Sequence, residues 1–142
     1  MARLVGAALA RAREAAGLTQ PALALELGVS SGTRVSLWER GAEQPQPKFV
    51  PMMAQILGVE PLRLLDGDPD QPTISALRLA AGLTRDEVWE QARITRMTYH
   101  RIDRGVGVRA PDPSVVRAIA TLLGVSPEDT LDAIHRARGA DA

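Results

Sequence analysis

The segment Ala-Ala-Gly-Leu-Thr occupies residues 15–19 and occurs again at residues 80–84. In each copy an arginine stands two positions before the first alanine, as Arg13 and as Arg78. The copies are about 65 residues apart, and this period is too long for the stacked units of a solenoid. We therefore interpret the 142-residue chain as two copies of one small domain.

The similarity between the copies extends well beyond the pentapeptide. Each copy continues to a closing hexapeptide, Ser-Leu-Trp-Glu-Arg-Gly at residues 36–41 and His-Arg-Ile-Asp-Arg-Gly at residues 100–105. Each then contains a proline, followed by an apolar stretch that ends in Leu-Gly-Val. The predicted boundaries are residues 1–67 for the first domain, 68–72 for a linker rich in Asp and Pro, and 73–142 for the second domain.

The composition predicts an all-α protein. Hydrophobic residues make up 45% of the chain but aromatic residues only 3%, so the cores must be built from aliphatic side chains. Good helix formers dominate, and no alternating run of Val, Ile and Thr indicates a strand. Thr19 and Thr84 are suitable N-caps, and Thr84 with Glu87 matches a capping box. Pro51 is compatible only with the first turn of a helix, so the fourth helix should start late.

Several classes of function are excluded or disfavoured by the composition. The chain has no cysteine and two widely separated histidines, so we expect no metal site and no cofactor. No grouping of nucleophile, base and orienting residue is present, so we do not expect an enzyme. The longest apolar stretch, residues 49–59, is interrupted by Pro51 and Gln55 and is too short to span a bilayer. We expect a cytoplasmic, nucleoid-associated protein without a membrane partner or a separate small-molecule effector domain.

The first copy resembles a known family. The pattern Gly-Leu-Thr-Gln-x-x-Leu-Ala-x-x-Leu-Gly-Val-Ser at residues 17–30, followed by Ser-x-Trp-Glu-Arg-Gly at residues 36–41, is similar to the helix-turn-helix of Cro/C1-type repressors, the XRE family. The second copy matches more weakly. The resemblance implies two tandem five-helix, lambda-repressor-like domains. In each domain the recognition helix would place its N-terminal residues in the major groove of double-stranded DNA.

In the first domain the resemblance implies DNA contacts at the second and third helices. Backbone N–H groups at a helix N-terminus bind phosphate, which favours Thr19 and Gln20. Arg34 is the strong candidate for base contact. The spacing before the closing motif is one residue longer than in the family, and it leaves open whether Ser31, Gly32 or Thr33 faces the groove. The predicted DNA-binding residues here are Thr19, Gln20, Ser31, Thr33, Arg34, Ser36 and Arg40.

The second domain keeps the family spacing and is more basic. Residues 93–109 carry five arginines and one acid. The resemblance places Arg96 and Arg101 at base-contacting positions, and arginine binds guanine O6 and N7 in a bidentate manner. Tyr99 suits either a phosphate contact or the buried position of its helix, and both interpretations stay open. The predicted DNA-binding residues here are Thr84, Arg85, Thr95, Arg96, Met97, Tyr99, Arg101 and Arg104.

The resemblance also implies two structural ion pairs, Arg13 with Glu39 and Arg78 with Asp103. Each would connect the first helix of a domain to the end of its third helix. The alternative is that all four are solvated surface charges.

These patterns favour a sequence-specific transcriptional regulator that binds two unequal half-sites on double-stranded DNA. Two different recognition helices on one chain would suit a non-palindromic site, and a homodimer is also compatible with the pattern. The formal net charge of zero gives no support of its own. The alternative is a protein-interaction adaptor, in which one or both copies bind a partner protein instead of DNA.

Overall fold

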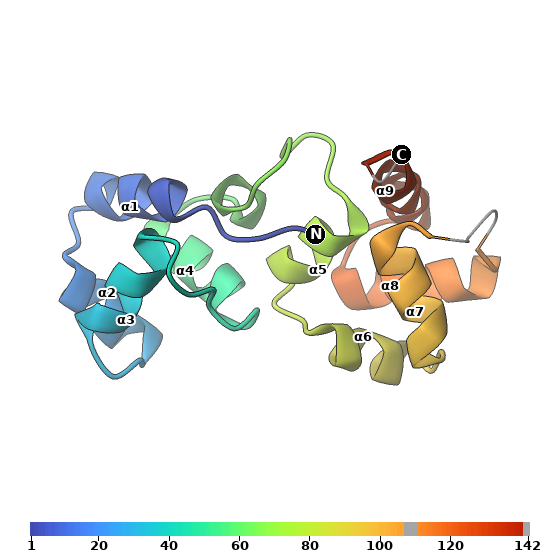
Figure 1. Cartoon of the computed structure of the whole chain (residues 1–142), viewed down its shortest axis with the longest axis horizontal. Coiled ribbons are helices and arrows are strands. Elements are labelled where there is room, and N and C mark those ends of the chain that lie inside the picture. The colour runs from blue at the N-terminus through green and yellow to red at the C-terminus, as the bar shows by residue number, and fades with distance from the viewer. Residues whose placement is uncertain (107–110, 141–142) are drawn as a thin grey trace.

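The computed structural model describes residues 1–106 and 111–140, with side chains described up to residue 137. Over these residues the chain is helical, and two helical units follow one another along its long axis (Figure 1). No helix in this part of the chain is long and apolar enough to cross a membrane. Arg109, one of the arginines counted in the second copy, lies outside the described residues.

The first unit contains α1 (Gly6–Ala15), α2 (Gln20–Leu27), α3 (Gly32–Glu39), α4 (Phe49–Leu57) and the 3-10 helix η1 (Pro61–Leu64). The second unit contains α5 (Ile74–Ala80), α6 (Arg85–Ala92), α7 (Arg96–Arg104), α8 (Pro113–Leu123) and α9 (Pro127–Ala140). The predicted all-α fold with tandem helix-turn-helix units is therefore confirmed.

Local sequence signals explain where several helices begin. The Thr19 hydroxyl accepts a hydrogen bond from the Ala22 N–H at 3.1 Å and caps α2. The predicted capping box of α6 is confirmed, because the Thr84 hydroxyl accepts from the Glu87 N–H while the Glu87 carboxylate accepts from the Thr84 N–H. Helix α4 begins at Phe49, so Pro51 lies in its first turn, as predicted. These caps satisfy N–H groups that have no partner within the helix.

Each unit has its own hydrophobic core, in which one large aromatic side chain, Trp38 or Tyr99, joins the aliphatic ones. The two cores use corresponding positions, because the buried Val35 and Trp38 of α3 are matched by the buried Tyr99 and Ile102 of α7. This burial orients each recognition helix and leaves its opposite face to solvent. Core residues of the first unit include Leu9, Leu23, Val35, Trp38 and Met53, and those of the second include Ile74, Val88, Tyr99, Ile102, Ile119 and Ile134.

The turn before the recognition helix differs between the units. It spans four residues between α2 and α3 but three between α6 and α7, which locates the extra residue of the first copy in the turn. Gly32 begins α3 close to α2, because a Cβ atom at Gly32 would lie 2.8 Å from the backbone nitrogen of Pro21. The glycine thus permits a close contact between the two helices. At the turn position of Gly28, the second unit has Arg93, which adopts a left-handed conformation at φ 58°.

Candidate nucleic-acid interface

A partly buried ion pair connects α1 to the end of α3 in the first unit. Arg13 Nε lies 2.6 Å from Glu39 Oε2, and Arg13 Nη1 donates to the Leu18 carbonyl at 2.9 Å. The hydrogen bond to Glu39 raises the pKa of Arg13 above its usual value. Gln20, at the start of α2, donates to Glu39 Oε1 at 3.0 Å. Gln20 therefore fixes the position of α2 relative to α3 through one carboxylate.

The second unit repeats this arrangement with a second arginine in place of the glutamine. Arg78 Nε lies 3.5 Å from Asp103 Oδ1, and Arg78 Nη1 donates to the Leu83 carbonyl at 2.9 Å. Arg85 takes the place of Gln20, and its Nε donates to Asp103 Oδ2 at 2.8 Å. The Asp103 side chain is 0% exposed and balances the charges of the buried Arg78 and the half-exposed Arg85. Arg85, predicted as a DNA-binding residue, already forms a salt bridge within its own domain.

The predicted DNA contact of Tyr99 is wrong. The residue is 0% exposed, and its hydroxyl donates to Asp103 Oδ1 at 3.2 Å in the core of the second unit. Burial, with the nearby Asp103 carboxylate, raises the pKa of Tyr99 and keeps the phenol protonated. The physical reason is the register of α7, because Tyr99 occupies the core position that Val35 has in α3. The buried interpretation of Tyr99 is the correct one.

We predict that Tyr99→Phe lowers the free energy of unfolding by about 1.5–3 kcal/mol, the usual range for a hydrogen bond to a charged group. Urea unfolding followed by circular dichroism measures this change. The affinity of the folded variant for DNA should stay within twofold of the wild-type value, because a buried phenol cannot reach a phosphate. A large loss of DNA affinity with unchanged stability would contradict the buried, structural role of Tyr99.

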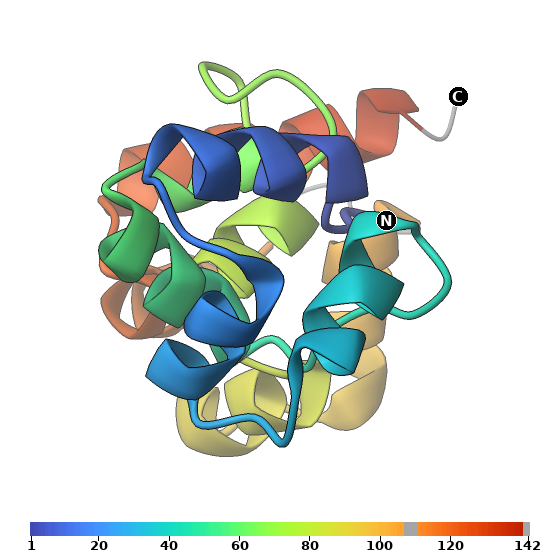
Figure 2. The same cartoon turned by 90° about the vertical axis from the view of Figure 1, so that its left-hand side faces the viewer.

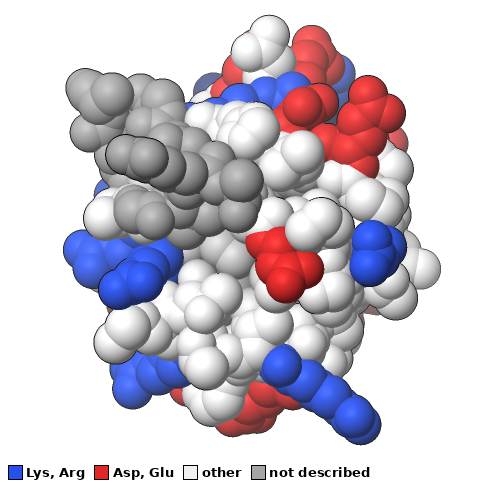
Figure 3. All heavy atoms as spheres, turned by 90° about the vertical axis from the view of Figure 1, so that its right-hand side faces the viewer, with Lys and Arg blue, Asp and Glu red and all other residues white. Residues whose placement is uncertain are grey.

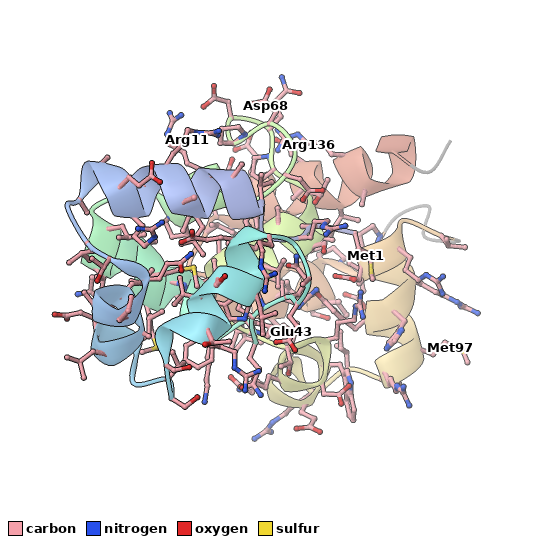
Figure 4. All side chains as sticks on the ribbon, turned by 60° about the vertical axis from the view of Figure 1, so that its left-hand side comes forward. Met1, Arg11, Glu43, Asp68, Met97 and Arg136 are labelled. Carbon is pink, nitrogen blue, oxygen red and sulfur yellow. The ribbon has the colours of Figure 1, made fainter. Side chains whose placement is uncertain are left out.

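The exposed face of α7 carries the basic side chains. Arg96, Arg101 and Arg104 are exposed, and no salt bridge to them is found among the residues that the structure describes. Thr95 caps the helix by accepting from the Thr98 N–H at 3.1 Å. Figure 3 views the second unit end-on, and basic side chains lie along its left edge. This edge is the side that faces the viewer in Figure 1, where α7 lies. Met97 is 65% exposed and projects away from the molecule (Figure 4).

The exposed face of α3 is less basic. Arg34 and Glu43 form a salt bridge at 3.2 Å, with side chains 50% and 46% exposed. Arg40 is exposed, and its Nε donates to the Ser36 carbonyl at 3.4 Å. Ser31 and Thr33 are both exposed at the start of α3, whereas Ser36 is half-buried. The structure thus places the seven residues predicted for the first domain on α2 and α3 or at the caps of these helices. An acid that was not predicted, Glu43, lies beside them.

That acid, Glu43, has no local sequence signal. It lies in the loop after α3, nine positions from Arg34, and only the path of that loop brings the two side chains together.

Trp89, at the position of Ala24 in the first unit, is half-buried against the second core, and its Nε1 donates to Asp86 Oδ1 at 2.9 Å. The large side chain is therefore accommodated at the edge of the core.

The comparison with known protein families agrees with this geometry. A helix-turn-helix domain model matches residues 4–66 and again residues 73–133. The chain therefore belongs to the helix-turn-helix family and contains two copies of the domain. No curated protein and no solved structure matches the chain. Two helix-turn-helix domains, each with an exposed recognition-helix face, indicate a DNA-binding regulator.

Proposed function

We propose that the protein is a sequence-specific transcriptional regulator of the Cro/C1 type that binds two unequal half-sites on double-stranded DNA. In this proposal residues 1–67 and 73–142 are the two DNA-binding domains, and α3 and α7 enter the major groove. The observation that carries the proposal is the basic face of α7. Its arginines are exposed, while the acid on the same helix, Asp103, is buried and already neutralised by Arg78 and Arg85.

This separation of charge explains how a chain of zero formal net charge can present a basic surface. A phosphate or guanine that approaches α7 meets Arg96, Arg101 and Arg104 without an exposed acid on that helix. A guanidinium binds guanine O6 and N7 through two parallel hydrogen bonds, whereas phosphate contacts fix the position of the protein without selecting a base. We assign base contacts to Arg96 and Arg101 and a phosphate contact to Arg104.

The first domain is proposed to make the weaker contact. Its recognition helix offers Arg34 as the one strong base-contacting side chain, and Glu43 competes with DNA for that side chain. Ser31, Thr33 and Arg40 are available for phosphate and water-mediated contacts. The two half-sites would therefore differ in sequence and in their contribution to affinity.

Selection of random genomic DNA fragments by the purified protein at physiological salt tests the proposal. The same selection is carried out with Arg34→Ala and with Arg96→Ala/Arg101→Ala. A motif with two parts is expected, one part degraded by each variant. Loss of only one part would limit DNA contact to a single domain. Absence of any enriched sequence would refute the proposal.

We predict that Glu43→Gln raises the affinity for the selected DNA by about two- to fivefold, the range that a weak exposed ion pair allows. The substitution frees Arg34 and removes a negative charge close to the proposed phosphate path. Glu60→Gln is the matched control, because it removes one exposed acid from the loop before η1. Fluorescence anisotropy with a labelled duplex measures both. Equal affinities for the two variants would show that the salt bridge with Glu43 does not limit DNA binding by Arg34.

A protein-interaction adaptor is the second candidate. The observation in its favour is Leu25, which is 82% exposed on α2. Single exposed apolar residues are common on soluble proteins, so this support is weaker. The salt dependence of DNA affinity separates the candidates, because each neutralised phosphate adds about 0.9 to the slope of log affinity against log salt. A slope near zero would favour the adaptor.

A further inference from the structure

The two recognition helices run in the same general direction. In Figure 1, α3 and α7 both begin at the lower side of the molecule and run upward, and in Figure 2 both lie on the right and again run upward. In a symmetric repressor dimer, a twofold axis makes the two half-sites inverted repeats. Here the units are instead displaced along the long axis without reversal. Both units would therefore bind the duplex facing the same direction along its axis.

The interface between the units is apolar and closely packed. Val50 of α4, Leu65 after η1 and Ala76 of α5 form a buried cluster of their own. Leu62 of η1 packs against this cluster and also against the core of the second unit. The half-buried Leu62 side chain of the first unit thus packs against the hydrophobic core of the second. Relative motion of two domains is the default unless their interface is large and hydrophobic, and the buried apolar cluster is the part of this interface that opposes such motion.

Hydrogen bonds tie the connecting segments to both units. The N-terminal segment crosses toward the second unit, where the Ala2 N–H donates to the buried Ser75 hydroxyl at 3.0 Å. The Arg3 N–H donates to Asp66 Oδ1 at 2.8 Å at the start of the connection between the units. At its other end, Arg136 of α9 donates to the Pro72 carbonyl at 3.1 Å. The connection is therefore held at both ends.

Gly82 shows how closely the units approach. It has φ +78°, and a Cβ atom there would lie 2.8 Å from Cγ of Pro51 in the first unit. Gly17 is its counterpart in the first repeat, with φ +73° but no atom within 4 Å of a Cβ. Both glycines have a positive φ that disfavours other residues, but only at Gly82 would a Cβ atom also clash with a neighbouring residue. They form a matched pair for testing the interface.

From these observations we propose that the interface joins both domains into one rigid DNA-binding unit, which binds half-sites in direct orientation at one fixed spacing. Gly82 is a specificity-determining residue for that spacing. The proposal rests on the proposed function, because it specifies the DNA that the two domains bind. A rigid bivalent protein gains avidity of about 10²–10⁴ only where both sites can be engaged together. It loses this gain when the geometry of the DNA is changed.

The test uses the duplex obtained by selection and two altered versions of it. One carries a 5-base-pair insertion between the half-sites, about half a helical turn, and the other has one half-site inverted. Both alterations should lower the affinity about 100-fold, to that of the stronger half-site alone. Gly82→Ala should weaken binding to the original duplex while leaving single half-site binding unchanged, and Gly17→Ala should alter neither. Full affinity for the inserted or inverted duplex would overturn the proposal.

Nitrogen-15 relaxation of the DNA-free protein gives a second readout that does not depend on DNA binding. One rotational correlation time for both units is expected, and two separate values would overturn the rigid interface. If the selection yields no motif but the units tumble together, the proposed function fails and the orientation proposal fails with it. If a motif is found but its halves tolerate insertion or inversion, only the present proposal fails.

Discussion

Asp103→Asn is expected to lower the free energy of unfolding by about 3–5 kcal/mol, the usual effect of removing one partner of a buried ion pair. The substitution keeps the size of the side chain but removes the charge that balances Arg78 and Arg85. The Arg85 side chain is 31% exposed and can turn toward water, whereas Arg78 is 6% exposed and cannot. The buried Arg78 guanidinium would keep only the Leu83 carbonyl as a strong partner.

A loss of this size is a large part of the total stability of a small domain, which is about 5–15 kcal/mol. Urea unfolding followed by circular dichroism measures it. Asp132→Asn is the matched control, because it makes the same chemical change at an exposed position of α9. We expect the control to stay within about 0.5 kcal/mol of the wild type. If Asp103→Asn behaves like its control, the ion-pair network does not stabilise the fold.

The second large effect concerns DNA affinity. Arg96→Ala/Arg101→Ala should weaken binding to the selected duplex by about 100-fold or more, since each guanine contact contributes about 1–3 kcal/mol. Both side chains are exposed and lie outside the buried network around Asp103, so stability should hardly change. Discrimination should fall only at the base pairs that α7 contacts. Anisotropy titrations with the selected duplex and with single base-pair variants measure both quantities.

Arg11→Ala/Arg63→Ala is the charge-matched control for this variant. It also removes two exposed arginines, one on α1 and one on η1. Arg11 lies at the upper side of the molecule in Figure 4, far from Met97 at the start of α7. The control should change affinity less than threefold and leave sequence preference intact. Equal losses in the two double variants would mean that overall charge, rather than α7, determines binding.

The helices could be predicted from sequence because their signals are local. The threonine caps and the position of Pro51 depend on interactions within a few residues, and each agrees with the structure. The Arg13–Glu39 and Arg78–Asp103 contacts, implied by family resemblance, are also present. The repeat itself supplied the remaining information, because similar segments at the same spacing must fold alike.

The inward face of α7 could have been predicted by aligning the two repeats at their closing hexapeptides. Aligned backward from the closing hexapeptide, Tyr99 corresponds to Val35, a core position, whereas alignment forward from the pentapeptide makes Arg85 the counterpart of Gln20. Without that alignment, a phosphate contact and a buried position were both open for Tyr99. The chemical ability of a tyrosine to donate to phosphate says nothing about which face of the helix it occupies. Burial of the face that includes Ile102 determines that direction.

The contacts between the repeats could not be predicted, because they have no internal counterpart. Ala2 with Ser75 and Gly82 with Pro51 each join residues from different repeats, so comparing one repeat with the other gives no signal. The Arg34–Glu43 pair likewise depends on the path of one loop. Such contacts arise from tertiary packing, and only coordinates show them. The DNA-binding role of the exposed residues stays a prediction.

Protection of guanine N7 from dimethyl sulfate on the selected duplex tests the central claim most directly, because N7 lies in the major groove, where α3 and α7 are proposed to bind. We predict protected guanines in both half-sites, with protection in one half lost in Arg96→Ala/Arg101→Ala and in the other lost in Arg34→Ala. Tight binding without guanine protection, or protection that neither variant changes, would contradict the account.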